Sequence, residues 1–412
     1  MLMNRLIGLI ILAISFSSCN RKVATLTEEA QLYEKAGQLA HQYIITDGHV
    51  DLPYRLKIQN FRLEREYIGI PVETAEGDFD YVRAKKGGLD APFMSIFIPA
   101  SYQDGRAKLL ADSLINMVGS IAEAHPDKFA MATSPAEVEA NFKKGLISLP
   151  MGMENGAPIE GDLRNVDYFH QRGIRYITLT HSKDNHICDS SYDTTHTWNG
   201  LSPFGREVVL EMNRVGIMVD VSHISDSAFW QVMAVTKAPC IASHSSCRKY
   251  TPGFERNMND EMIQRLGENG GVIQINFGTD FLDGQMSKRN DAMREELDAL
   301  LKKEGLKDSD ADAQPIVQQF VKDHPTLYAD VQTVANHIDH VVKLAGVGHV
   351  GFGSDFDGVG DSLPTGLKDV SQYPNLIYEL LKRGYSEEDI GKMCYKNVWR
   401  VWKEVERVAA EM

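Results

Sequence analysis

Eight short apolar runs, each followed by a polar tip, constrain the fold of this chain more than any other feature. The runs span residues 43–51, 92–98, 146–154, 175–181, 217–223, 240–244, 272–277 and 350–355. Near-continuous apolar runs are typical of strands that are buried on both faces of a parallel sheet. Between these runs, apolar residues recur at helical spacing over 107–121, 207–215 and 330–344. The alternation predicts an α/β fold, specifically a (β/α)8 TIM-type barrel with insertions.

The length of 412 residues suits one large barrel domain. We predict a linker and helix over 19–42 and a single domain over 43–412. The charged segment at about 280–325 exceeds what a minimal barrel needs, and we expect a solvated helix and loop inserted after the seventh strand. Pro150 lies inside the third run, where a proline removes a ladder hydrogen bond, so we expect a bulge there.

The overall charge restricts the partners of the chain. Forty-three lysines and arginines against 57 acidic residues give a net charge of −14. Such a chain repels phosphate backbones, which argues against general nucleic-acid binding. The apolar share of 43% and the charged share of 24% are ordinary for a soluble globular domain, and they exclude a disordered or multi-span membrane protein.

The N-terminus has the features of an export signal. Arg5 precedes an apolar segment over 6–15, which is too short to span a bilayer, and two serines lead to Cys19. The segment resembles a bacterial lipoprotein signal over 1–18, which implies lipidation of Cys19 and a membrane-anchored protein in the periplasm or at the cell surface. An ordinary secretory signal cut nearby is the alternative. Of the remaining cysteines, Cys240 is predicted to be a buried thiol, and one disulfide among the four stays open.

Six of the eight runs end in a histidine or a carboxylate. In a barrel the carboxyl ends of the strands converge on one face, where active sites form. His49 and Asp51 point to the same side of one strand because they are two residues apart. Imidazoles and carboxylates together suit Zn²⁺ or a similar ion, and a bridging carboxylate suits two metals that activate water as hydroxide. The residues at these tips are His49, Asp51, Glu154, His181, His223, His244 and Asp355.

In these strand-end residues and the motifs around them, the chain resembles the membrane (renal) dipeptidase family of zinc-dependent, amidohydrolase-like barrels. The resemblance covers about residues 43–405 and rests on motifs whose order and spacing agree. These motifs are DGHVDL at 47–52, MENG at 153–156, YITLTHS at 176–182, DVSH at 220–223, SHSS at 243–246, GSDFDGV at 353–359 and the segment 363–380.

The resemblance implies a metallodipeptidase and a role for each matched position. His49 and Asp51 would hold one Zn²⁺, His223 and His244 a second, and Glu154 would bridge both. His181 would contact the substrate and stabilise the tetrahedral intermediate, and Asp355 would move the proton. Arg256, in an Arg-Asn pair, would bind the terminal carboxylate of the substrate, with Arg248 as the rival. The substrates would be dipeptides, including those with a C-terminal D-residue, cleaved by a metal-bridging hydroxide, and the enzyme would form a homodimer.

Two rival functions stay open at this point. One is another binuclear metallohydrolase of the same barrel class, acting on a lactone, a cyclic amide or an N-acyl amino acid. The other is a lipid-anchored solute-binding protein, which the complete set of ligands and Asp355 disfavours.

Two further groups of residues are weaker candidates. His337 and His340 have a spacing that can bind metal, but we expect a solvated helix face there. His186, His196 and Trp198 follow the fourth strand, where they either line a substrate entrance or lie on the surface.

Overall fold

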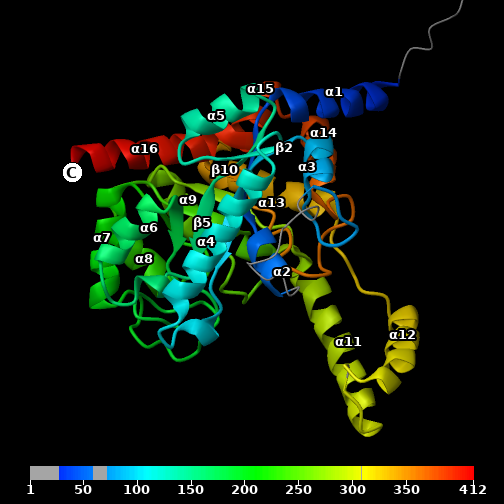
Figure 1. The fold of residues 1–412 in the computed structure, drawn as a ribbon. Coiled ribbons are helices and arrows are strands. Elements are labelled where there is room, and N and C mark those ends of the chain that lie inside the picture. The colour runs from blue at the N-terminus through cyan, green and yellow to red at the C-terminus, as the bar shows by residue number, and fades with distance from the viewer. Residues whose placement is uncertain (1–26, 59–71, 308) are drawn as a thin grey trace, which may run out of the picture.

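The computed structural model describes residues 27–58, 72–307 and 309–412, and within them the predicted barrel is confirmed (Figure 1). Eight parallel strands close in the order β1-β10-β9-β8-β7-β6-β5-β2. Each predicted run contributes one strand of this barrel. The strands are β1 (Ile45–Val50), β2 (Leu89–Phe97), β5 (Met151–Glu154), β6 (Ile174–Thr178), β7 (Met218–Asp220), β8 (Ile241–Ser245), β9 (Val272–Ile275) and β10 (Val350–Phe352).

Helices surround this barrel, and several begin at a side-chain cap that the sequence supplies. Ser202 caps α7 with a proline behind it, and Asp330 caps α13, so one otherwise unpaired N–H group in each first turn is satisfied. The helices are α1 (Glu28–Gln42), α2 (Leu52–Ile58), α3 (Tyr81–Gly87), α4 (Ala107–Ala124), α5 (Pro135–Lys143), α6 (Arg164–Gln171), α7 (Pro203–Val215), α8 (Asp226–Val235), α9 (Asp260–Glu268), α10 (Thr279–Leu282), α11 (Gly284–Lys303), α12 (Gln314–Asp323), α13 (Val331–Ala345), α14 (Tyr373–Lys382), α15 (Glu387–Gly391) and α16 (Asn397–Glu411).

The third run is not one bulged strand, as the sequence suggested, but two strands that separate at Pro150. The first half forms β4 (Ile147–Leu149), which pairs with β3 (Phe129–Met131) in a small second sheet that the sequence analysis missed. The second half forms β5 of the barrel. Proline has no N–H to donate to a ladder, but the Pro150 carbonyl accepts a hydrogen bond from the Met94 N–H, so the break stays bonded to β2.

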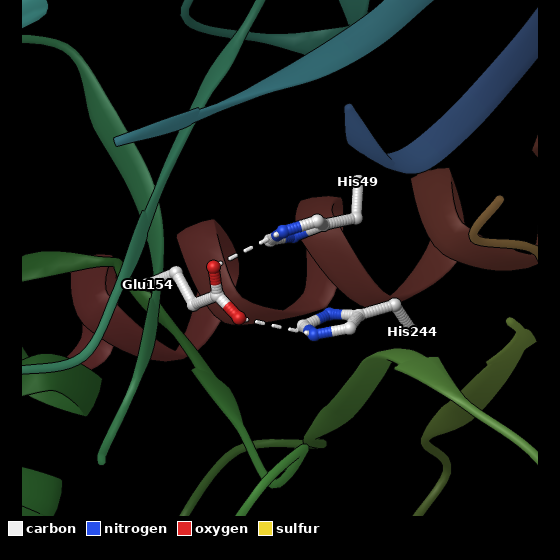
Figure 2. Close-up of side chains that lie close together, drawn as sticks. All are labelled: His49, Glu154 and His244. Carbon is white, nitrogen blue, oxygen red and sulfur yellow. Dashed lines mark ion pairs between the residues drawn. The ribbon is translucent and has the colours of Figure 1, made fainter. Parts of the chain in front are cut away.

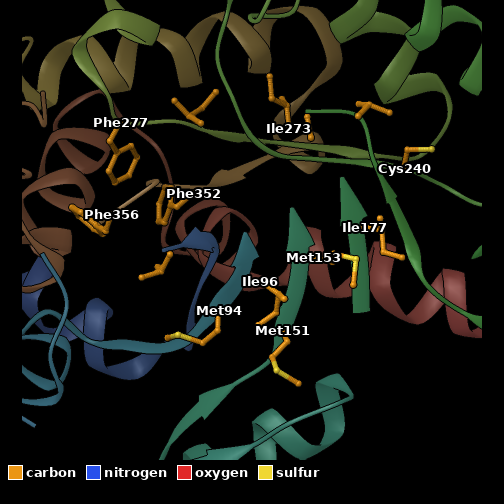
Figure 3. Packing of buried hydrophobic residues seen from close by; sticks show 14 of the residues in the cluster. Met94, Ile96, Met151, Met153, Ile177, Cys240, Ile273, Phe277, Phe352 and Phe356 are labelled. Atoms are coloured by element: carbon orange, nitrogen blue, oxygen red, sulfur yellow. The ribbon is translucent and has the colours of Figure 1, made fainter. Parts of the chain in front are cut away.

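The core lies in two places. Apolar side chains on the outer faces of the strands pack beneath the helices, among them Met94, Ile96, Met153, Ile177 and Ile273 (Figure 3). A second cluster contains Trp399 and Trp402 of α16 together with Phe93 and Tyr176 of the barrel. The C-terminal helix therefore covers the amino ends of the strands and leaves the carboxyl ends as the open mouth.

Helices α11 and α12 project away from the barrel (Figure 1). In α11 only Leu301 is buried, and no residue of α12 is. None of the helices in the described ranges is both long and apolar enough to cross a membrane. The predicted signal over 1–18 and Cys19 lie outside the described residues.

The structure confirms the prediction for Cys240 and contradicts the one for His337 and His340. Cys188, Cys240, Cys247 and Cys394 are all free and buried, as predicted for Cys240. The face of α13 that carries His337 and His340 is buried, so the expected solvated face is wrong. His337 Nδ1 accepts from the Cys247 N–H, and its Nε2 lies 2.9 Å from the Leu282 carbonyl oxygen. This histidine is a structural link between loops.

Candidate metal centre

The structure brings the polar strand tips to one mouth of the barrel. His49, Glu154 and His244 stand on β1, β5 and β8, and His223 and His181 follow β7 and β6 by three residues. Asp355 follows β10 by three residues and, like His223, has a left-handed backbone, with φ of 62° and 69° respectively. Such strained conformations cluster at functional sites because the surrounding structure must hold them.

Glu154 is the centre of this arrangement. Its Oε2 lies 3.4 Å from His49 Nε2, while its Oε1 lies 3.2 Å from His244 Nε2 and 2.9 Å from His223 Nε2. Figure 2 shows the carboxylate between His49 and His244, with one oxygen turned toward each ring. The two rings stack at 3.8 Å. One carboxylate therefore faces two sets of donors, as the bridging role requires.

A second layer of hydrogen bonds orients the imidazoles. The ring of His49 uses Nδ1 to bond the Tyr176 hydroxyl at 2.8 Å, which leaves Nε2 for the site. His244 Nδ1 bonds the Ser243 hydroxyl at 2.7 Å, and that hydroxyl in turn donates to Asp220. Metal-binding histidines generally use their far nitrogen in this way, which fixes the ring and its tautomer.

Two glycines make room for the centre. A Cβ added at Gly152 would lie 2.0 Å from the Tyr176 ring, so only glycine lets that tyrosine reach His49 across the barrel. A Cβ at Gly358 would lie 2.1 Å from Asp355 Oδ1 and 2.3 Å from Asp51 Oδ2. The backbone at Gly358 thus forms a close wall beside both carboxylates.

Asp355 has a partner that the sequence analysis did not identify. The Asn276 amide donates to Asp355 Oδ2 at 2.7 Å, and its own oxygen accepts from the Gly278 N–H at 2.7 Å. Both ends of the amide are thus fixed. Asn276 directly follows β9, one of the two barrel strands without a predicted site residue at its end, and a polar residue at that tip was the available signal.

The donor set fits a binuclear metal site. Three groups have ligand atoms within 4.8 Å of one another: His49 with Glu154 and His244, Glu154 with His181 and His223, and His49 with Asp51 and Asp355. His49 Nε2 and Asp51 Oδ1 are buried without a hydrogen-bond partner among the described residues. Buried polar atoms are rarely left unpaired, and a cation between them would satisfy both.

The protonation states of His244 and Glu154 also favour the binding of a cation. Burial and the nearby His49 lower the pKa of His244 to about 3, so this imidazole is neutral. Burial favours protonation of Glu154, but the neighbouring His49 and His181 and hydrogen bonds from His223 and His244 outweigh it. These groups hold the pKa of Glu154 well below its usual value. Neutral imidazole and ionised carboxylate are the forms that bind metals. His49 differs from His244. Burial would lower its pKa, but Tyr176, Glu154 and Asp51 outweigh burial and hold that pKa well above the usual value, so His49 must lose its proton when a metal binds.

The structure separates the two candidate arginines. Arg248 makes a two-pronged ion pair with Asp226, with N–O distances of 2.6 and 2.7 Å. Arg256 instead lies buried next to the site, bonded to the Ser245 hydroxyl and the His244 carbonyl, with its Nε unpaired. Arg256 therefore retains donor capacity beside the metal cluster, whereas Arg248 is occupied elsewhere.

A pocket of about 550 Å³ opens above the cluster, which is within the usual range for small-ligand sites. Asp51, Glu154, His181, His223 and Asp355 line it. From the long loop after β6, Tyr192 and Ser182 reach the pocket, whereas His186, His196 and Trp198 do not. Aromatic and apolar walls that the sequence analysis missed complete the pocket: Tyr54, Phe97, Phe281 and Val359.

The comparisons with known proteins agree with this site. The family model described as "Membrane dipeptidase (Peptidase family M19)" matches residues 33–412. An uncharacterized dipeptidase of Schizosaccharomyces pombe is 31% identical over 90% of this chain and 83% of its own. A dipeptidase of Aspergillus oryzae is 33% identical over 89% of this chain and 79% of its own.

Two solved structures extend the agreement to the fold. The probable dipeptidase PvdM of Pseudomonas aeruginosa superposes with a TM-score of 0.77 at 26% identity, covering 92% of this chain and all of that one. A metallopeptidase of Rhodobacter sphaeroides, solved with a phosphinate mimic of L-Ala-D-Ala, gives 0.70 at 25% identity, covering 88% and 99%. With a family match over nearly the whole chain and a barrel mouth of the expected donors, the chain belongs to the membrane dipeptidase family, peptidase family M19, and is a metallodipeptidase.

Proposed function

We propose that this enzyme is a zinc-dependent dipeptidase that hydrolyses short dipeptides, including those with a C-terminal D-residue. The observation that carries the proposal is Glu154, whose two oxygens face separate imidazole donors at the floor of one pocket. The mimic bound to the Rhodobacter sphaeroides relative supports the substrate class.

The metals would be held by the residues that converge on Glu154. His49 and Asp51 would bind one zinc ion, His223 and His244 the other, and Glu154 both. When bound, zinc supplies a Lewis acid for the peptide carbonyl and lowers the pKa of a water molecule toward neutrality.

The remaining steps belong to the side chains of the chain itself. Asp355, held by the Asn276 amide, accepts the proton of the attacking water and returns it to the leaving amine. His181 lines the pocket and stabilises the oxygen that gains charge in the tetrahedral intermediate.

Arg256 binds the terminal carboxylate of the substrate, since its planar guanidinium suits a carboxylate and its Nε is unpaired. A carboxylate fixed so close to the scissile bond restricts the substrate to dipeptides.

The test is release of D-alanine from L-Ala-D-Ala by the purified protein beginning after Cys19. Activity that is lost on chelation and restored by Zn²⁺ supports the proposal. A protein that binds two zinc ions yet leaves this and other dipeptides intact contradicts it. That result would favour a lactone, a cyclic amide or an N-acyl amino acid as substrate.

We also propose that the protein is exported and anchored by a lipid on Cys19, on the basis of the signal-like segment over 1–18. Mass spectrometry of the N-terminal peptide from the membrane fraction tests this. A diacylglyceryl cysteine is expected, and an unmodified residue at 19 contradicts it.

A further inference from the structure

A second cavity lies beside the active-site pocket and is formed by the projecting helices. It has a volume of about 180 Å³. Met293 and Leu297 of α11 face Phe320 and Val321 of α12 across it. Asp280 and Ser362 line this cavity and the active-site pocket alike. The two spaces therefore meet at these two residues.

The junction between the two spaces is fixed in place. Thr279 is fully buried, and its backbone N–H donates to the Ser362 carbonyl at 2.8 Å. Its hydroxyl donates to the same carbonyl and accepts from the Ala329 N–H at 3.1 Å. One threonine thus ties the start of the insertion, its end and the loop after β10. The cavity keeps its position relative to the metal centre.

Asp280 is the distinctive group at this junction. Its side chain is half-buried, and its carboxylate makes no hydrogen bond or ion pair with another described residue. Among the described residues that line the cavity, Arg294 is the one lysine or arginine; it is largely exposed and lies 3.8 Å from Asp291. A partly desolvated carboxylate without a partner favours a cationic ligand.

The position of Asp280 indicates which part of a dipeptide would reach it. The next residue, Phe281, packs its ring 5.2 Å from the Arg256 guanidinium. If Arg256 holds the terminal carboxylate, the C-terminal residue of the substrate lies beside Phe281, and its side chain extends toward Asp280 and the cavity mouth.

Resting on the proposed dipeptidase function, we infer that the cavity between α11 and α12 is a subsite for the side chain of the C-terminal residue. The subsite favours long basic side chains such as lysine. The methylene stem packs against Met293, Leu297 and Phe320, and the ammonium group pairs with Asp280. Lysine side chains commonly bury their stem on apolar surface in this way.

The experiment compares kcat/KM for L-alanyl dipeptides that end in alanine, norleucine, lysine or glutamate. The wild type is expected to prefer lysine over norleucine and to disfavour glutamate. In Asp280→Asn the lysine-to-norleucine ratio should fall about three- to tenfold, since one ion pair is lost. Asp298→Asn, an exposed change on α11, is the matched control and should leave that ratio unaltered.

A bulky side chain that fills the cavity tests whether its apolar walls contribute to substrate binding. Leu297→Trp should lower kcat/KM for both long side chains relative to L-Ala-L-Ala, while Leu300→Trp, on the same helix but outside the cavity, should not.

The outcomes separate this inference from the proposed function. If no dipeptide is cleaved, the dipeptidase function itself fails. The subsite is overturned if L-Ala-L-Ala is cleaved but Asp280→Asn leaves the lysine-to-norleucine ratio unchanged and Leu297→Trp leaves kcat/KM for the long side chains unchanged relative to L-Ala-L-Ala. A response of L-Lys-L-Ala instead of L-Ala-L-Lys overturns the assignment to the C-terminal residue.

Discussion

The barrel mouth, built on strand ends, and the α11–α12 insertion, built from two helices, differ in how tightly their side chains are packed. At the mouth, His49, Glu154 and His244 are buried, and a second layer of hydrogen bonds fixes the far ring nitrogens of the two histidines. In the insertion, one residue of α11 is buried, and the cavity walls are half-exposed at Met293, Leu297 and Phe320 and exposed at Val321. The catalytic groups thus lie where packing is dense, whereas the inferred selectivity lies in a helix pair that tolerates change.

The largest effect is expected at the bridging carboxylate. Glu154→Gln removes the charge shared by both donor sets, and activity should fall on the order of 1,000-fold or more. Metal content by atomic spectroscopy should fall below two ions per chain. Glu139→Gln, an exposed change on α5, is the control. A Glu154→Gln enzyme with full metal content and activity would contradict the bridging role.

A smaller loss in rate is expected at the proposed proton shuttle. Asp355→Asn should lower kcat about 10²- to 10⁴-fold with little change in KM, because the amide cannot accept the proton. Steady-state kinetics on L-Ala-D-Ala, with metal content measured in parallel, checks this. A rise in KM alone would make Asp355 a binding residue and leave the shuttle to another group.

The two regions should also differ in stability. Ile273→Ala in β9 leaves a cavity in the packed core and should cost about 2–5 kcal/mol. Leu300→Ala on α11, where the side chain is 36% exposed, should cost less than about 0.5 kcal/mol. Chemical denaturation of both variants measures the difference. Equal losses would mean that the insertion is packed as tightly as the barrel.

A pH effect tests the link between the two regions. Burial lowers the pKa of His337 to about 4, so the folded state binds this proton less readily than the unfolded chain. Stability is therefore fully present above the unfolded pKa near 6.5 and is lost as pH falls toward 4, by about 3 kcal/mol. Melting temperatures of metal-free wild type and His337→Gln should converge on acidification. Parallel curves would show that His337 does not titrate as described.

Much of this protein followed from residue order alone. The eight runs predicted the eight barrel strands because a strand buried on both faces must be apolar throughout, which is a local property. The polar residues at the strand ends could be predicted from the sequence as well, because each of them ends such an apolar run. His49, Glu154 and His244 were therefore predictable before any contact was known.

Tertiary structure decided what depends on distant neighbours. Arg248 is occupied by Asp226, 22 residues away, and the orientation of Asp355 rests on Asn276, 79 residues away. The burial of His337 depends on loops of other strands, and the break at Pro150 on a second sheet. The periodicity of apolar residues indicates whether a residue is buried. It does not indicate which side chain that residue contacts, because such contacts depend on packing between elements far apart in the chain.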